Sequence, residues 1–181
     1  MKLSPPDSAL RACVVVPARN EEDLVGASLS ALAMQANVHP EQYEVLLVLD
    51  RCTDGTRERA MEIAGAHPRL RLHLLEGPGL GSGHARRAGM EAACERLMGL
   101  GRPGGLIAST DADTVVARDW LSAQLAATAR GARAIGGRIE LDVGSLQQAV
   151  VTWHAERGRK RHQRILADPD LLGTAEHWQL M

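Results

Sequence analysis

The stretch that decides the fold is Leu106-Ile107-Ala108-Ser109-Thr110-Asp111-Ala112-Asp113. Its first three residues form a short apolar run, which predicts a buried strand. Two carboxylates follow, and in a loop just past a strand such side chains can converge on one ion. Carboxylate oxygens suit Mg²⁺ or Mn²⁺, so Asp111 and Asp113 are candidate metal ligands. The alternative is that Asp113 or Thr114 simply caps the next helix.

Length and composition fit a globular domain with an aliphatic core. The chain has 181 residues, of which 45% are hydrophobic and 24% charged. It contains no Phe, one Tyr and three Trp, so a surface that stacks nucleic-acid bases is not expected. The formal net charge of −1 gives no general attraction to nucleic acid or to an anionic membrane.

The cellular setting is predicted from what the sequence lacks. The cysteines Cys13, Cys52 and Cys94 form no C-x-x-C pair, which fits a reducing compartment and argues against a zinc site. No apolar signal core opens the chain and no run reaches transmembrane length, so we expect a cytoplasmic protein. Residues 157–164 are dense in positive charge and follow a short apolar stretch. They could touch a membrane surface, or form a solvated helix face.

Apolar runs and helical patterns alternate along the chain. Strands are predicted at 12–16, 43–49, 70–75, 106–108 and 132–141. Helices are predicted from Asn20, as N-cap, to about residue 35, then to about residue 65, at 84–100, at 120–130 and at 145–167. This order predicts an α/β fold with a mostly parallel sheet and helices on both faces.

Polar residues follow four of the predicted strands, and the carboxyl ends of parallel strands meet at one sheet edge. Ligands of such folds bind at that edge. The residues concerned are Arg19, Asn20 and Glu21 after the first strand, Asp50 and Asp54 after the second, the glycine-rich loop 76–83 after the third, and Asp111 and Asp113 after the fourth. Their convergence predicts a binding site.

The glycine-rich loop is a candidate diphosphate site. It lacks the G-K-[ST] of a nucleotide-triphosphate loop and the G-x-G-x-x-G that follows a first strand in dinucleotide folds. It opens a helix that carries Arg86 and Arg87, and backbone N–H groups at a helix start, Gly83 among them, favour anions. The alternative is a flexible loop before a solvated basic helix.

Asp50 ends the second strand and allows two interpretations. Its carboxylate could accept a hydrogen bond from a base N–H or from a sugar hydroxyl. It could instead cap the helix that follows, a role that Thr53 or Asp54 could also take.

Four motifs in the same order resemble the family 2 glycosyltransferases of the GT-A fold. They are Val15-Val16-Pro17-Ala18-Arg19-Asn20-Glu21-Glu22, Val48-Leu49-Asp50-Arg51-Cys52-Thr53-Asp54-Gly55-Thr56, Ala85-Arg86-Arg87-Ala88-Gly89 and Asp111-Ala112-Asp113. The resemblance covers about residues 13–141. It implies inverting transfer of a sugar from a nucleotide-diphosphate donor, UDP- or GDP-linked, to an acceptor that the sequence does not identify, with Mn²⁺ or Mg²⁺ as cofactor.

The resemblance also implies roles for individual residues. Pro17, Asn20 and Glu21 would line the nucleoside pocket, beside Arg19, and Asp50 would contact the base. Arg86 would lie near the base and diphosphate, Asp111 would face the ribose or the metal, and Asp113 would hold the metal.

The chain departs from the family pattern in two places. Arg87 stands where the family usually has Asn. The family also normally continues into an acceptor region with a general base, and Asp168, Asp170 and Glu176 match no such motif, so no catalytic base is identified. We therefore expect a flexible end at 1–10, a nucleotide-sugar-binding GT-A core at 11–143, and a helix and tail at 144–181 that begin an incomplete acceptor region.

Three functions remain open at this point. The first is a metal-dependent glycosyltransferase, or its donor-binding half alone. The second is a catalytically inactive module that binds nucleotide sugars or a partner. The third is a nucleotidyltransferase, which usually carries a glycine-rich, Arg-containing loop directly after its first strand; here that position reads Pro17-Ala18-Arg19-Asn20-Glu21.

Overall fold

The computed structural model describes residues 3–140. In chain order the elements are β1 (Ala12–Ala18), α1 (Val25–Ala33), the 3₁₀ turn η1 (Pro40–Gln42), β2 (Tyr43–Leu49), α2 (Thr56–Ala66), β3 (Leu72–Glu76), α3 (Ser82–Gly99), β4 (Leu106–Ser109) and α4 (Trp120–Ala129). All of them belong to one compact unit, Met1–Ile135. The predicted helix at 145–167 and the basic stretch at 157–164 lie outside the described residues.

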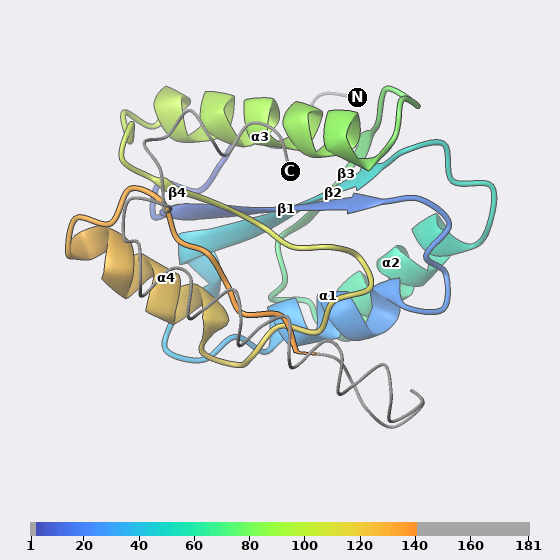
Figure 1. The fold of residues 1–181 in the computed structure, drawn as a ribbon, viewed down its shortest axis with the longest axis horizontal. Helices are drawn as coiled ribbons and strands as arrows, with labels where there is room; N and C mark the ends of the chain where they lie inside the picture. The colour runs from blue at the N-terminus through green and yellow to red at the C-terminus, as the bar shows by residue number, and fades with distance from the viewer. Residues whose placement is uncertain (1–2, 141–181) are drawn as a thin grey trace, which may run out of the picture. The chain divides into compact units, whose positions relative to one another are not determined.

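The four strands form one parallel sheet in the order β3-β2-β1-β4. This confirms the predicted α/β architecture. Strands β1 and β2 are buried along their whole length, as apolar runs interrupted only by Glu44 require when helices cover both faces. Figure 1 shows α3 on one face of the sheet and α1, α2 and α4 on the other.

Alternate residues of β1 supply two separate cores, because successive strand side chains point to opposite faces. Val14 and Val16 pack with Leu29 of α1 and Leu121 of α4. On the other face, Val15 packs with residues of α3, among them Ala85, Ala93 and Leu97.

The connections place a topological switch point between β1 and β4. The chain runs outward from β1 through β2 to β3, then crosses to the far side of β1 to form β4. β4 pairs with β1 only as far as Ser109, opposite Val15, whereas β1 continues beside β2 to Ala18, opposite Leu49. The last residues of β1 therefore have no paired strand on the β4 side, which leaves room at the switch point. Crevices of this kind are where open parallel sheets bind ligands.

The predicted start of the first helix is wrong. The helix begins at Val25 and has no acidic residue in its first turn. Asn20 adopts a positive φ of 57° and does not cap it. Its side-chain Oδ1 accepts a hydrogen bond from the backbone N–H of Thr53 at 2.8 Å, so the amide joins two loops instead.

The predicted fifth strand is also wrong over the residues that the structure describes. Residues 132–140 form no strand, and most of them are exposed. Gly136 and Gly137 lie inside this segment, and glycine weakens a strand because it has no side chain to pack. Among residues 3–140 the sheet therefore ends at β4 on one side and at β3 on the other.

Residues 3–10, at the end predicted to be flexible, pack against the rest of the unit. Leu10 is fully buried, and the carboxylate of Asp7 pairs with Arg71 at 2.8 Å. The carbonyl of Ser4 accepts a hydrogen bond from Arg96 at 2.9 Å.

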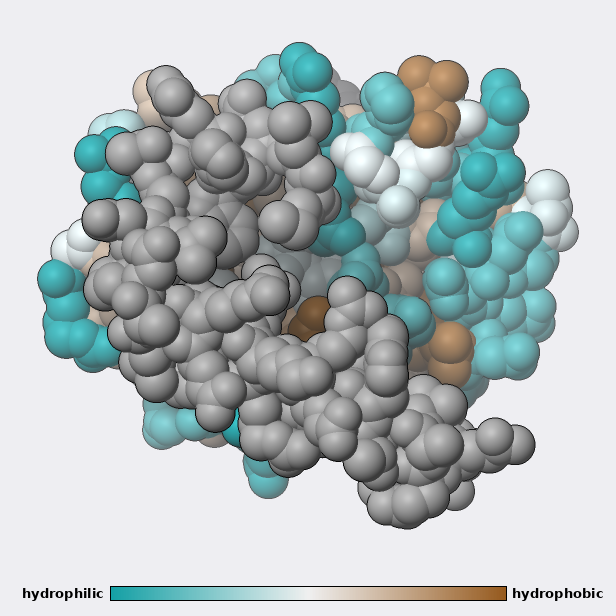
Figure 2. Space-filling model, viewed as in Figure 1, coloured by the Kyte–Doolittle hydropathy of each residue, from teal (hydrophilic) through white to brown (hydrophobic). Residues whose placement is uncertain are grey.

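The surface shown in Figure 2 is mostly hydrophilic over the region that holds α2 and the neighbouring loops in Figure 1, with hydrophobic residues in small separate groups. Within residues 3–140, none of the helices combines the length and the apolar character that crossing a bilayer requires.

Candidate donor-binding site

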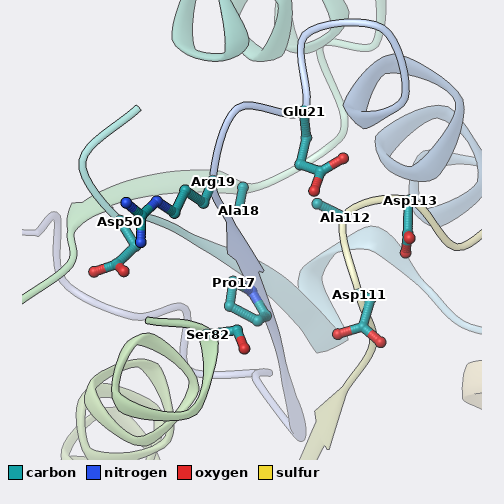
Figure 3. A pocket seen from close by; sticks show the side chains of 9 residues that line it. All are labelled: Pro17, Ala18, Arg19, Glu21, Asp50, Ser82, Asp111, Ala112 and Asp113. Atoms are coloured by element: carbon teal, nitrogen blue, oxygen red, sulfur yellow. The ribbon is translucent and has the colours of Figure 1, made fainter. Parts of the chain in front are cut away.

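A pocket of about 210 Å³ lies at the carboxyl ends of the strands. It is lined by Pro17, Ala18, Arg19, Glu21, Asp50, Ser82, Asp111, Ala112 and Asp113. Figure 3 shows Asp50 and Arg19 on one side of Pro17, with Glu21, Asp111 and Asp113 on the other. Pockets that enclose a drug-sized ligand measure roughly 300–1,000 Å³, so this one would surround only part of a nucleotide sugar.

The structure brings together most of the residues predicted for the site. Six of the lining residues were predicted to bind the donor or the metal: Pro17, Arg19, Glu21, Asp50, Asp111 and Asp113. Asn20, Gly83 and Arg86 are not among the lining residues. Asn20 joins the loops after β1 and β2 through its bond to Thr53, and Arg86 pairs with the pocket residue Asp111.

The D-x-D segment is held by the residue between its two carboxylates. Ala112 is buried in the core that covers one face of the sheet. Thr110, just before it, donates its backbone N–H to the carbonyl of Val15 at 3.2 Å. With Ala112 anchored inside, Asp111 and Asp113 are left at the pocket wall. The sequence shows the two carboxylates but gives no local sign that the alanine anchors them.

Arg86 joins helix α3 to this segment. Its guanidinium donates to the carboxylate of Asp111 at 2.5 Å and also to the hydroxyl of Ser109. Ser109 in turn donates to the carbonyl of Val15 at 2.9 Å. A cationic side chain is therefore placed beside the first carboxylate of the D-x-D pair.

The loops after β1 and β2 are tied to each other, which fixes Glu21 at the pocket. Glu21 donates its backbone N–H to the hydroxyl of Thr56 at 2.9 Å, and Glu22 donates its own to the carboxylate of Asp54 at 3.1 Å. Glu22 also accepts from the backbone N–H of Gly55 at 3.0 Å. Hydrogen bonds from Thr56 lower the pKa of Asp54 below its usual range.

Negative charge accumulates around Glu21. Burial raises the pKa of this carboxyl above its usual range, and the nearby charges of Asp113, Asp54 and Asp111 raise it further. The arrangement thus favours a cation at this edge of the sheet.

The carboxylates fit a divalent ion that arrives with a diphosphate. In residues 3–140 no cluster of three or more His, Cys, Asp or Glu side chains forms a complete metal site. Mg²⁺ commonly binds one or two carboxylates and takes its other ligands from substrate phosphates and water, and Asp111 with Asp113 offers that donor set. Because Asp111 already pairs with Arg86, Asp113 is the less engaged carboxylate.

Helix α3 begins beside the pocket, at Ser82. The first N–H groups of an α-helix have no intrahelical partner and carry the positive end of the helix dipole. The pocket therefore has carboxylates on one wall and a positive helix end on another.

Comparisons with known proteins agree with this geometry. The family model described as "Glycosyl transferase family 2" matches residues 13–179. The chain is 30% identical over 129 residues to glycosyltransferase AglE of Haloferax volcanii, an alignment that covers 70% of this chain and 38% of AglE.

The fold resembles solved structures of the same architecture. The S. aureus TarS fragment 1-349 matches with a TM-score of 0.54 at 22% identity, covering 67% of this chain and 33% of that fragment. A mannosyltransferase from Pyrobaculum calidifontis, solved with GDP-Man and Mn²⁺, matches with a TM-score of 0.49 at 29% identity, covering 65% of this chain and 34% of that one. The chain thus spans between a third and two fifths of the length of AglE, of the TarS fragment and of the mannosyltransferase.

The sheet, its helices and the strand-end pocket define a GT-A fold. The chain belongs to glycosyl transferase family 2. This favours the first of the three functions left open by the sequence over a nucleotidyltransferase.

Proposed function

We propose that the strand-end pocket binds a nucleotide-diphosphate sugar, UDP- or GDP-linked, together with Mn²⁺ or Mg²⁺, and that the chain serves inverting glycosyl transfer. The observation that carries the proposal is the pocket itself. It combines the D-x-D carboxylates, the start of α3 and the polar ends of β1 and β2 at the switch point of the sheet.

Different residues of the pocket would contact the nucleoside and the diphosphate of the donor. Pro17, Arg19 and Glu21 would line the nucleoside side of the pocket, with Asn20 holding their loop against the next one. Ser82, Gly83 and Arg86, at the start of α3, would face the diphosphate with backbone N–H groups and a guanidinium. TarS, which has this fold, has been crystallised with UDP and with UDP-GlcNAc.

Asp113, with Asp111 beside it, would hold the metal ion. A bound divalent ion supplies positive charge that stabilises the diphosphate as it leaves. Arg86, which pairs with Asp111, would lie near that charge, and Asp111 would face the ribose or the ion. No residue is assigned as the base that takes the acceptor proton. The acidic residues near the end of the chain, Asp168, Asp170 and Glu176, fall outside the described residues.

Calorimetric titration with UDP and with GDP, each with and without Mn²⁺, tests the proposal. We expect metal-dependent binding of one of the two, and weak binding of Mn²⁺ alone because the protein offers only part of its ligand shell. Asp113→Asn should weaken nucleotide binding in Mn²⁺ about tenfold or more, a loss on the order of 1.4 kcal/mol, with little change in its absence.

Asp119→Asn is the matched control. Asp119 is an exposed aspartate just before α4 and does not line the pocket, so its substitution should leave both titrations unchanged. A folded wild-type chain that binds neither nucleotide, or an Asp113→Asn variant with unaltered metal dependence, would contradict the proposal.

A further inference from the structure

Arg51 directly follows β2 and has a backbone conformation that arginine rarely adopts. Its φ is +56°, in the left-handed region that glycine occupies without penalty and that a Cβ makes unfavourable. Strained backbone of this kind persists only where the surrounding structure holds it, and it is concentrated at functional sites. The presence of an arginine here, where a glycine would relieve the strain, therefore calls for an explanation from its side chain.

The Arg51 side chain lies against the glycine-rich loop that follows β3. A Cβ on Gly79 would lie 2.7 Å from Cδ and 2.9 Å from Cζ of Arg51, so the missing side chain of Gly79 leaves room for the arginine. The backbone N–H of the same glycine donates to Oδ1 of Asp50 at 2.5 Å. Arg51 and the carboxylate of Asp50 are thus neighbours of one glycine, beside the pocket that Asp50 lines.

The guanidinium of Arg51 is available to a ligand. The residue is exposed, and among residues 3–140 it forms no ion pair, whereas the next basic residue, Arg57, pairs with Glu76. A guanidinium presents five N–H donors in a planar fork and no acceptor. A ligand with hydrogen-bond acceptors is therefore the partner that suits it.

Asp50 supplies the complementary acceptor. Its two oxygens accept the backbone N–H groups of Gly79 and Gly81, but an ionised carboxylate has about four lone-pair sites, so each oxygen can take one further donor. Figure 3 shows Asp50 and Arg19 on the side of Pro17 that faces away from the D-x-D carboxylates, which is the end of the pocket left for the nucleoside.

We propose that Arg51 determines base specificity: its guanidinium donates to a carbonyl of the nucleotide base while Asp50 accepts the adjoining base N–H. This inference rests on the proposed donor site. An N–H beside a carbonyl occurs on the pairing edge of uracil and of guanine. Adenine and cytosine instead present an amino group beside a ring acceptor, which would set donor against donor at Arg51 and acceptor against acceptor at Asp50. The two residues therefore admit UDP or GDP and reject ADP and CDP.

Calorimetric titration in Mn²⁺ with UDP, GDP, CDP, ADP and inorganic pyrophosphate tests the contact. The wild type should bind UDP or GDP at least about tenfold more tightly than CDP and ADP. Arg51→Met keeps an aliphatic chain against Gly79 but loses the donors, so it should weaken the preferred nucleotide about tenfold and leave pyrophosphate unchanged. Arg69→Met is the control, because Arg69 is exposed shortly before β3, at the opposite edge of the sheet, and should change neither affinity.

Arg51→Gly separates the ligand contact from a role in folding. Glycine fits a φ of +56°, so the unfolding midpoint should stay at the wild-type value or rise, while the preferred nucleotide binds about tenfold more weakly. Asn37→Gly is the matched control. Asn37 is exposed, has a φ of +59° and precedes the amino end of β2, so this variant should lose no affinity.

Four results would overturn the inference. They are a wild-type preference for CDP or ADP, nucleotide affinity that is unchanged in Arg51→Met, an equal loss of pyrophosphate affinity, which would place Arg51 at the diphosphate, and a lower unfolding midpoint in Arg51→Gly, which would make the arginine a support of the loop. A wild-type chain that binds no nucleotide and no pyrophosphate contradicts the proposed function and the inference with it. Nucleotide binding that does not respond to Arg51→Met contradicts the inference alone.

Discussion

Helix α3 carries two arginines that pair with carboxylates near opposite edges of the sheet. Arg86 pairs with Asp111 at the pocket, where the two side chains are 30% and 58% exposed. Arg96, about 15 Å further along the helix axis, pairs with Glu44, and there the side chains are 8% and 2% exposed. The first pair can be opened by a ligand or an ion, whereas the second lies inside the protein.

The buried pair has every partner it needs. Arg96 donates to both oxygens of Glu44, through Nε and, at 2.7 Å, through Nη2. His73 contacts Glu44 at 3.2 Å, and the thiol of Cys13 donates to it at 3.3 Å. Burial raises the pKa of the Cys13 thiol, as does the Glu44 charge, so the thiol stays protonated and can donate.

The difference between the two pairs shows how one helix serves two purposes. Cys13, Glu44 and His73 are the second residues of β1, β2 and β3, so the buried cluster lies at the amino ends of the strands. Arg96 joins α3 to Glu44 of β2 and His73 of β3 at this edge, while Arg86 is presented at the opposite edge, where ligands bind.

Replacing each arginine by methionine tests whether the two ion pairs differ in their contribution to stability. Arg96→Met leaves the buried Glu44 charge without its main partner and should cost about 3–5 kcal/mol of stability. Arg86→Met removes a partly exposed pair and should cost about 0–1 kcal/mol. Urea unfolding of the two variants measures both values, and equal losses would show that burial does not distinguish the pairs.

The buried pair also predicts a dependence of stability on pH. Burial raises the pKa of Glu44, but hydrogen bonds from Arg96 and His73 and the Arg96 charge outweigh it, and the pKa falls from 4.5 to about 2. Between these values the unfolded chain binds more protons than the folded one. The contribution, on the order of 3 kcal/mol, is complete above pH 4.5 and is lost as the pH falls towards 2.

The measurement is a series of urea unfolding curves for wild type and Glu44→Gln from pH 6 to the lowest pH at which both fold. The difference in stability between them should narrow as the pH falls below 4.5. A difference that stays constant would contradict the proposed state of Glu44.

A smaller effect is expected where α3 touches the sheet between its two arginines. A Cβ on Gly89 would lie 2.4 Å from Cγ1 of Val15 and 2.9 Å from Cγ2 of Val48. Gly89→Ala should therefore cost about 1–3 kcal/mol through overpacking. Gly99→Ala at the end of the same helix meets nothing within 4 Å and serves as the control. Thermal unfolding compares the two, and equal midpoints would mean that α3 can shift on the sheet.

Regular elements could be predicted where local pattern and environment agree. The run 43–49 is apolar apart from Glu44 and matches β2 residue for residue, because a strand covered on both faces has no exposed side to blur its limits. Strand β3 begins at Leu72 and not at residue 70, a shift typical of element boundaries. Residues 132–140, predicted as part of a fifth strand, form no strand in the described structure, because a pattern within one segment supplies no neighbouring strand.

Contacts between distant residues could not be predicted. Asn20 looks like a helix cap because capping is a local pattern, yet its side chain bonds to the loop after β2. Glu44 and Arg96 look like surface charges within their own elements, and only the fold brings them together. Asp50 lines the pocket at the strand ends, where the sequence predicts it, but its contacts with Gly79 and Gly81 depend on a loop that follows a different strand.

The measurement that tests the account most directly is an amide NMR titration of the ¹⁵N-labelled chain with UDP and with GDP in Mg²⁺. The account predicts that one of the two shifts the signals of the strand-end residues 19–21, 50, 81–86 and 110–113. The signals of Cys13, Glu44, His73 and Arg96 should stay in place. Shifts centred on the buried cluster, or none at the strand ends with either nucleotide, would contradict the division of α3 into a ligand-binding end and a structural end.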